Sequence, residues 1–146
     1  MTDREQKAAA KAFAEKWLAK EGYEIGETQQ FWNDLLKVFG ITDVSDYIEY
    51  EKRVELNQKS SKSQKCRIDG YIPSVPVMIE QKGRNVDIRK AEKQSDGTML
   101  TPHAQAKRYV QWLPLSQRPK YIIVCNFEEF LVYDENDPVY PLNPQS

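Results

Sequence analysis

The sequence predicts an α/β fold in which helices flank a mixed β-sheet, with the elements in the order α-α-β-β-β-α-β-β. Three observations predict it. Apolar side chains recur at helical spacing near the N-terminus, short strands bounded by turn residues fill the middle, and a continuous apolar run near the C-terminus is typical of a strand buried on both faces. With 146 residues, of which 40% are hydrophobic, the chain is long enough for one core.

Two helices come first. Residues 3–20 are rich in alanine, and Phe13 and Trp17 lie one helical turn apart. Residues 28–39 carry two neighbouring apolar stripes, and Gly40 directly after them is a good helix stop. We therefore expect two amphipathic helices, separated by a break that contains two glycines.

Short runs rich in apolar residues predict the strands, because polar or proline-containing segments separate them. The expected strands are residues 50–56, 67–72, 77–82, 121–125 and 130–133. Residues 57–65 are rich in serine and lysine, which favours a loop or the tip of a hairpin. The second and third strands surround the sequence Pro-Ser-Val-Pro and therefore form a tight hairpin.

A third helix is expected between the two groups of strands. Residues 83–100 are charged and irregular in pattern. Thr101 followed by Pro102 is a strong helix start, because the hydroxyl caps the first turn and proline fits the first helical position. The helix should end near Leu113, just before a second proline.

Composition and charge limit the classes of function. No apolar run approaches the length of a membrane span and no secretory signal is present, so we expect a cytoplasmic protein without a membrane partner. Residues 52–93 hold eleven basic and five acidic side chains, although the whole chain has a net charge of −1. This basic middle is either a surface that faces a polyanion or a solvated lysine-rich loop.

The tight hairpin is expected to place two acids opposite each other. The predicted cross-strand pairs are Ile72 with Val77, Tyr71 with Met78, Gly70 with Ile79, Asp69 with Glu80, Ile68 with Gln81, and Arg67 with Lys82. Side chains alternate between the two faces of a strand. One face would then be apolar, with Ile68, Gly70, Ile72, Val77 and Ile79, and the other would carry Asp69, Glu80 and Lys82.

Two opposed carboxylates repel each other unless a neighbouring positive charge offsets them. Lys82 provides one such charge, and a divalent cation would provide a stronger one. Carboxylates at this spacing suit Mg²⁺, with the backbone carbonyl of Gln81 as a third ligand. The pattern therefore predicts metal-assisted phosphodiester hydrolysis, in which Lys82 orients water or stabilises negative charge. Spacing alone leaves a plain surface hairpin as the alternative.

These residues resemble the PD-(D/E)xK nucleases. Residues 68–73 read IDGYIP and residues 77–82 read VMIEQK, which is similar to the Asp…Glu-x-Lys signature of that superfamily, although Ile68 stands where proline often precedes the first acid. In the following helix, Gln105 and Tyr109 lie four residues apart and resemble the additional motif of its RecB-like branch. By themselves these two residues fit an ordinary amphipathic helix.

A narrower resemblance covers nearly the whole chain. The sequences GETQQFW at 26–32, KQSDGTMLTP at 93–102 and VCNF at 124–127 resemble the N-terminal region of large single-chain restriction–modification enzymes. The resemblance implies a restriction-endonuclease-like domain at 1–137 with an N-terminal helical extension, and a proline-rich linker at 138–146. The methyltransferase and target-recognition domains, and the use of S-adenosylmethionine, would belong to downstream parts that are absent from this chain.

The same resemblance implies further site residues and partners. Related nucleases often carry an acid on the first core helix, which points to Glu27, although a favourable charge at a helix N-terminus explains that residue equally well. The expected partner is double-stranded DNA, cut with Mg²⁺ or with Mn²⁺ in its place, and double-strand cleavage would need a transient homodimer. The expected DNA contacts are Arg84, Arg89, Lys90, Lys93, Ser95 and Thr98, although a plain polar loop at 93–98 is equally consistent.

Two other interpretations stay open at this point. The first is a nuclease-like module that has lost catalysis and only docks DNA or a partner domain. The intact set of Asp69, Glu80 and Lys82 argues against it. The second is a structural domain in which the acid pair is incidental, and it predicts that removing Asp69 leaves the protein no less stable.

Overall fold

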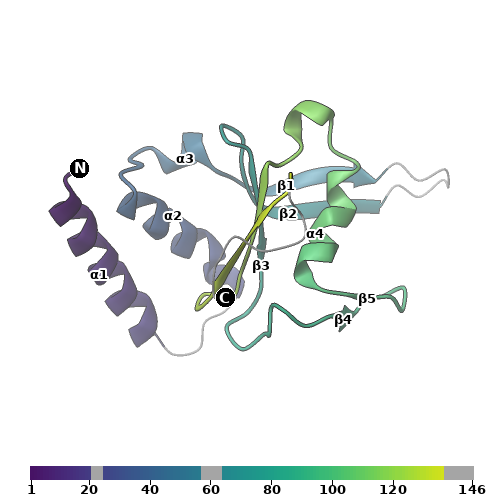
Figure 1. Cartoon of the computed structure of the whole chain (residues 1–146), viewed down its shortest axis with the longest axis horizontal. Coiled ribbons are helices and arrows are strands. Elements are labelled where there is room, and N and C mark those ends of the chain that lie inside the picture. Colours follow the sequence, from purple (N-terminus) through teal and green to yellow (C-terminus); the bar gives the residue numbers. More distant parts are fainter. Residues whose placement is uncertain (21–24, 57–63, 137–146) are drawn as a thin grey trace.

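A computed structural model describes residues 1–20, 25–56 and 64–136 of the chain. A central sheet separates two helical layers: α1, α2 and α3 lie on one side of it and α4 on the other (Figure 1). The elements are α1 (Asp3–Ala19), η1 (Ile25–Glu27), α2 (Thr28–Val38), α3 (Val44–Tyr47), β1 (Glu49–Leu56), β2 (Gln64–Ile72), β3 (Val77–Gln81), β4 (Glu92–Lys93), β5 (Met99–Leu100), α4 (Pro102–Val110), η2 (Leu115–Gln117), β6 (Tyr121–Cys125) and β7 (Phe130–Asp134).

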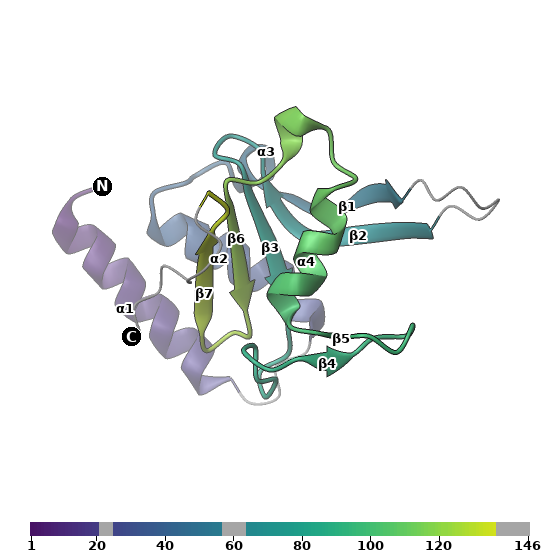
Figure 2. The same ribbon diagram turned by 45° about the vertical axis from the view of Figure 1, so that its right-hand side comes forward.

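The main sheet has five strands in the spatial order β1-β2-β3-β6-β7. The first three strands are antiparallel, β3 pairs parallel with β6, and β6 pairs antiparallel with β7. A parallel pair needs a long crossover, and α4 supplies it by crossing the sheet between β3 and β6 (Figure 2). This architecture confirms the predicted mixed sheet flanked by helices.

Each face of the sheet is covered by its own apolar cluster. On the α2 side, Phe31, Trp32, Ile72 and Ile79 are buried together, and on the α4 side Met78, Ala106 and Val124 form part of a second cluster. Burial on both faces explains why β6 and the first three residues of β3 read as continuous apolar runs.

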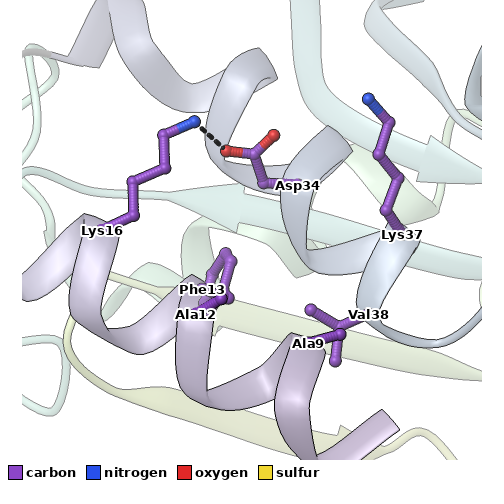
Figure 3. A pocket seen from close by; sticks show the side chains of 7 residues that line it. All are labelled: Ala9, Ala12, Phe13, Lys16, Asp34, Lys37 and Val38. Carbon is purple, nitrogen blue, oxygen red and sulfur yellow. Dashed lines mark hydrogen bonds and ion pairs between the residues drawn. The ribbon is translucent and has the colours of Figure 1, made fainter. Parts of the chain in front are cut away.

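Helix α1 is attached to the rest of the fold through α2. The hydroxyl of Thr2 caps its first turn by accepting a hydrogen bond from the amide of Glu5. Trp17 is buried against the ring of Phe31, with ring centroids 5.2 Å apart. Beside this contact Lys16 reaches across to Asp34 of α2, at the rim of an open groove between the two helices (Figure 3).

Ile68 is the exception to the predicted alternation of the hairpin. It is buried with Met78 on the α4 side and not with Ile72 and Ile79 on the α2 side. The pairing of β1 with β2 skips one position here, between Tyr50–Gly70 and Lys52–Ile68. Because the ladder is interrupted, side chains on its two sides no longer alternate in one phase.

Several element boundaries differ from the sequence expectation. Helix α4 ends at Val110, and tighter turns carry the chain on to Leu113, whose amide donates to the carbonyl of Val110. Residues 83–100 are not wholly irregular, because β4 and β5 form a small hairpin there. The tail at 138–146 lies outside the described residues. Within the described ranges no helix is both long and apolar enough to cross a membrane.

Candidate active site

The site lies where the hairpin of β2 and β3 stops being a regular ladder. The pairs Ile72–Val77, Tyr71–Met78 and Gly70–Ile79 occur as predicted, and the paired register ends with the last of them. Beyond it, Oδ2 of Asp69 accepts a hydrogen bond of 2.8 Å from the main-chain amide of Gln81. The predicted ladder pair of Asp69 and Glu80 therefore does not form. Instead, the Asp69 carboxylate accepts the hydrogen bond that a main-chain carbonyl would accept in a regular ladder.

The next strand keeps the end of β3 in the sheet. Glu80 and Gln81 pair with Val124 and Cys125 of β6, and the amide of Lys82 donates to the carbonyl of Cys125 at 2.7 Å. The side-chain oxygen of Gln81 is also fixed, since it accepts 2.7 Å from the indole N–H of buried Trp32. The backbone that carries Glu80 and Lys82 is consequently held from both sides.

Glu80 is a buried acid with one close cation. Only 7% of the surface of Glu80 is exposed, and its Oε1 lies 3.3 Å from Nζ of Lys82. The pKa of Glu80 is raised to about 7, chiefly by burial and then by the charge of Asp69, while Lys82 opposes both effects. The pKa of Asp69 is raised as well, chiefly by burial, while the hydrogen bond from the Gln81 amide works in the opposite direction.

Helix α4 brings Gln105 to the same site. Its Oε1 accepts a hydrogen bond of 2.8 Å from Nζ of Lys82, so the predicted glutamine meets the predicted lysine across 23 positions in sequence. Thr101 fixes the start of this helix by capping the amide of Ala104, as the sequence indicated. Tyr109 lies one turn farther along, where its side chain packs against the α4-side core.

A small polar cavity lies beside Asp69. It measures about 210 Å³ and is lined by Gly26, Thr28, Gln29, Glu51 and Asp69. Sequence reasoning missed Glu51, which stands at the skipped position of the β1–β2 ladder and has a φ of +52°. Its charge raises the pKa of Asp69. The antiparallel register of β1 on β2 places position 51 opposite position 69, and no pattern within either strand indicates that register.

Glu27 lies at the edge of this region, between Gly26 and Thr28, which line the cavity. It occupies the N-cap position of α2, where its side chain makes no capping hydrogen bond. Its carboxylate instead forms an ion pair of 2.6 Å with Lys20 at the end of α1. A role for Glu27 at the site stays a prediction.

Asp69 and Glu80 fit a divalent cation as a pair of hard oxygen ligands. Two carboxyls whose pKa values are both raised mark a place where added positive charge would be stabilising. In residues 1–20, 25–56 and 64–136 no group of three or more His, Cys, Asp or Glu side chains is arranged to hold a metal ion. The Gln81 carbonyl stays the predicted third ligand.

Two of the expected DNA contacts are engaged within the protein. Arg84 donates to the Glu128 carboxylate, and Arg89 forms an ion pair of 2.6 Å with Glu129, so both side chains tie the segment after β3 to the turn before β7. Their partners lie far along the chain, which is why sequence reasoning did not find them.

The other expected contacts lie on the surface around the β4–β5 hairpin. The exposed residues among them are Lys90, Lys93, Ser95 and Thr98. Arg108 of α4, which the sequence analysis did not single out, donates to the hydroxyl of Thr98 at 2.8 Å and to Asp96 at 3.2 Å. These hydrogen bonds attach the β4–β5 hairpin to α4, the helix that carries Gln105.

Comparison with known proteins places the chain in a family. A solved structure described as the crystal structure of SSO0001 is similar over 91% of this chain and 77% of that chain, at 16% sequence identity and with a TM-score of 0.35. A search of curated proteins gave no match. The family described as "MmeI, N-terminal domain" matches residues 8–143, which is nearly the whole chain. The chain therefore belongs to the family of MmeI N-terminal domains.

Proposed function

We propose that this chain is the DNA-cleaving module of an MmeI-type restriction enzyme, a PD-(D/E)xK-like nuclease that hydrolyses phosphodiester bonds with Mg²⁺, or with Mn²⁺ in its place. The observation that carries the proposal is the meeting of Asp69, Glu80, Lys82 and Gln105 at the end of β3. Family membership supports the restriction-enzyme context. These four residues come from β2, the end of β3 and α4, which an incidental surface hairpin would not require.

Each residue has a role that its contacts support. Asp69 and Glu80 would hold the cation, which when bound would supply Lewis-acid stabilisation of the phosphate charge and make water more acidic. Lys82 is held between Glu80 and Gln105 at 3.3 and 2.8 Å, so its ammonium has a defined position. From there it would orient the attacking water or stabilise the oxyanion that develops on the phosphate.

The remaining functions would lie in other parts of the full protein. We propose that sequence selection and methylation, with S-adenosylmethionine, belong to domains downstream of this chain, and that the segment 138–146 leads toward them. One site cuts one strand, so cleavage of both strands would use a transient dimer on DNA. The exposed residues Lys90, which precedes β4, and Lys93 of β4 would contact the DNA backbone.

Plasmid nicking tests the proposal. Wild-type protein, Asp69→Asn and Lys82→Ala are incubated with supercoiled plasmid at low salt, with Mg²⁺, with Mn²⁺ or with EDTA. The matched controls are Asp46→Asn and Lys37→Ala, since both residues are exposed and are placed in none of the site contacts. We expect metal-dependent nicking by the wild type and both controls, and at least a hundredfold loss in the two site variants, an order of magnitude typical of groups that act on the transition state.

Two results would contradict the proposal. Nicking that persists in Asp69→Asn and Lys82→Ala would show that the activity comes from another site or another protein. A wild type that neither nicks nor takes up Mn²⁺ in calorimetry would instead favour the inactive DNA- or partner-docking module.

A further inference from the structure

Lys82 stands at one end of a continuous chain of hydrogen bonds that reaches the β4–β5 hairpin. Its Nζ donates to Oε1 of Gln105, and Nε2 of Gln105 donates to Oε1 of Gln94 at 2.5 Å. Nε2 of Gln94 then donates to the main-chain carbonyl of Glu92 at 2.9 Å. Two side-chain amides thus connect the lysine of the site to the backbone of β4.

The two ends of this chain fix its direction. A main-chain carbonyl can only accept hydrogen bonds, and a lysine ammonium can only donate them. Gln94 must therefore turn its NH₂ group toward Glu92 and its oxygen toward Gln105. Gln105 must in turn direct its NH₂ group at Gln94, which leaves its oxygen for Lys82. With the opposite orientation the Gln105 amide would present donors to a cation.

Gln94 is itself held firmly. Its main-chain amide donates to the main-chain carbonyl of Thr98 at 2.8 Å, and its main-chain carbonyl accepts from the amide of Gly97 at 2.9 Å. Arg108 binds Asp96 and Thr98 in the same turn and so ties it to α4, the helix of Gln105. Because the main chain of Gln94 is hydrogen-bonded through both its amide and its carbonyl, its side chain loses little conformational freedom when it binds Gln105.

We propose that Gln94 is a positioning residue: it fixes the side-chain amide of Gln105 so that Gln105 offers an oxygen to Lys82 and holds the ammonium at the site. The effect of Gln94 on cleavage rests on the proposed function, whereas its effect on the contact between Lys82 and Gln105 does not. The direction of donation along the chain requires an acceptor at position 94 that faces Gln105.

Four variants separate this role from a structural one. Gln94→Met keeps the length of the side chain but removes the acceptor, and Gln94→Glu keeps an acceptor. Gln105→Glu makes the orientation of the amide irrelevant, because both carboxylate oxygens accept from Lys82, and it is made alone and together with Gln94→Met. Gln111→Met is the matched control, since Gln111 is exposed at the end of the same helix.

Two measurements are made on every variant of this chain. The first is the NMR cross-peak between the Hε protons of Lys82 and the Hγ protons of Gln105, which reports their contact without any need for activity. The second is the rate of Mn²⁺-dependent plasmid nicking, separated into kcat and KM. The melting temperature is followed by tryptophan fluorescence, so that a loss of fold is recognised.

We expect Gln94→Met to weaken the cross-peak and to lower kcat about three- to tenfold, the effect of releasing one rotamer-rich side chain, with KM unchanged. Gln94→Glu should restore both, and Gln94→Met should add nothing to Gln105→Glu. An undiminished cross-peak in Gln94→Met would overturn the proposal. So would a change in KM alone, which would make Gln94 a DNA contact. If the wild type neither nicks nor takes up Mn²⁺, the proposed function fails, but the cross-peak still decides the role of Gln94.

Discussion

Replacing Glu80 by glutamine should stabilise the metal-free protein, in spite of the loss of an ion pair. The pKa of Glu80 rises from 4.5 to about 7 in the folded chain, mainly through burial and then through Asp69. Between these pH values the folded state binds the proton more tightly than the unfolded state does. The contribution of Glu80 to stability is therefore greatest below pH 4.5 and declines as the pH rises to 7.

The size of the effect follows from the shift. A rise from 4.5 to about 7 corresponds to roughly 3 kcal/mol of lost stability above pH 7, at about 1.4 kcal/mol per pKa unit. Glutamine resembles the protonated acid in shape and carries no charge, so Glu80→Gln avoids this loss. Lys82 keeps Gln105 as its partner in the variant. The expected gain at pH 8 is about 3 kcal/mol, or roughly 10 °C in melting temperature.

Urea denaturation in EDTA, followed by tryptophan fluorescence from pH 4.5 to 8, measures the difference. The two proteins should be equally stable near pH 4.5 and diverge as the pH rises. Glu15→Gln, on the exposed face of α1, serves as the surface control. A Glu80→Gln variant that is no more stable than the wild type at pH 8 would refute the reasoning, because it would show that Glu80 is ionised at little cost. On the proposed function, Mn²⁺ at a hundred times its Kd should stabilise the wild type by about 2.7 kcal/mol, and the variant by less.

Two further substitutions test how the site is supported. Trp32→Phe removes the indole N–H that donates to the buried oxygen of Gln81, and the unsatisfied acceptor should cost about 1–3 kcal/mol in urea unfolding; an unchanged midpoint would mean that water replaces the indole. Gly70→Ala places a Cβ 3.1 Å from the side chain of Ile79, and we expect a loss of about 1–3 kcal/mol from overpacking. Gly26→Ala, where a Cβ meets nothing within 4 Å, should leave the same unfolding curve unmoved, and equal effects of the two would argue against the close packing.

Local sequence patterns were sufficient for the parts of the fold that depend on neighbouring residues. The turn between β2 and β3 determines which residues face each other, so the pairs Tyr71–Met78 and Gly70–Ile79 follow from its position. The start of α4 follows from the hydroxyl of Thr101 and the ring of Pro102. The continuous apolar run of β6 follows from its burial between two helical layers.

The rest of the site depends on contacts that no local pattern contains. The interruption of the ladder at Glu51 moves Ile68 to the other face and brings a third acid near Asp69. Period-two alternation cannot foresee such a break, because it assumes an unbroken ladder. In the same way, the ion pair between Arg89 and Glu129 depends on how distant loops meet. Charge along the sequence indicated a basic segment, but it did not reveal which of its cations are already paired.

The loss of stability caused by ionised Glu80 in the metal-free protein and the proposed affinity of the site for a cation have the same cause. The sheet buries the end of β3, and there Glu80 lies close enough to Asp69 for the charge of one to raise the pKa of the other. The low exposure that makes ionised Glu80 unfavourable also strengthens its attraction to a divalent cation, because little water screens the charge. Protons and a cation would then compete for the same carboxylate, so binding near pH 7 would release a proton and weaken as the pH falls. An acid pair that lowers stability at neutral pH is thus what a metal-dependent site built on two carboxylates requires.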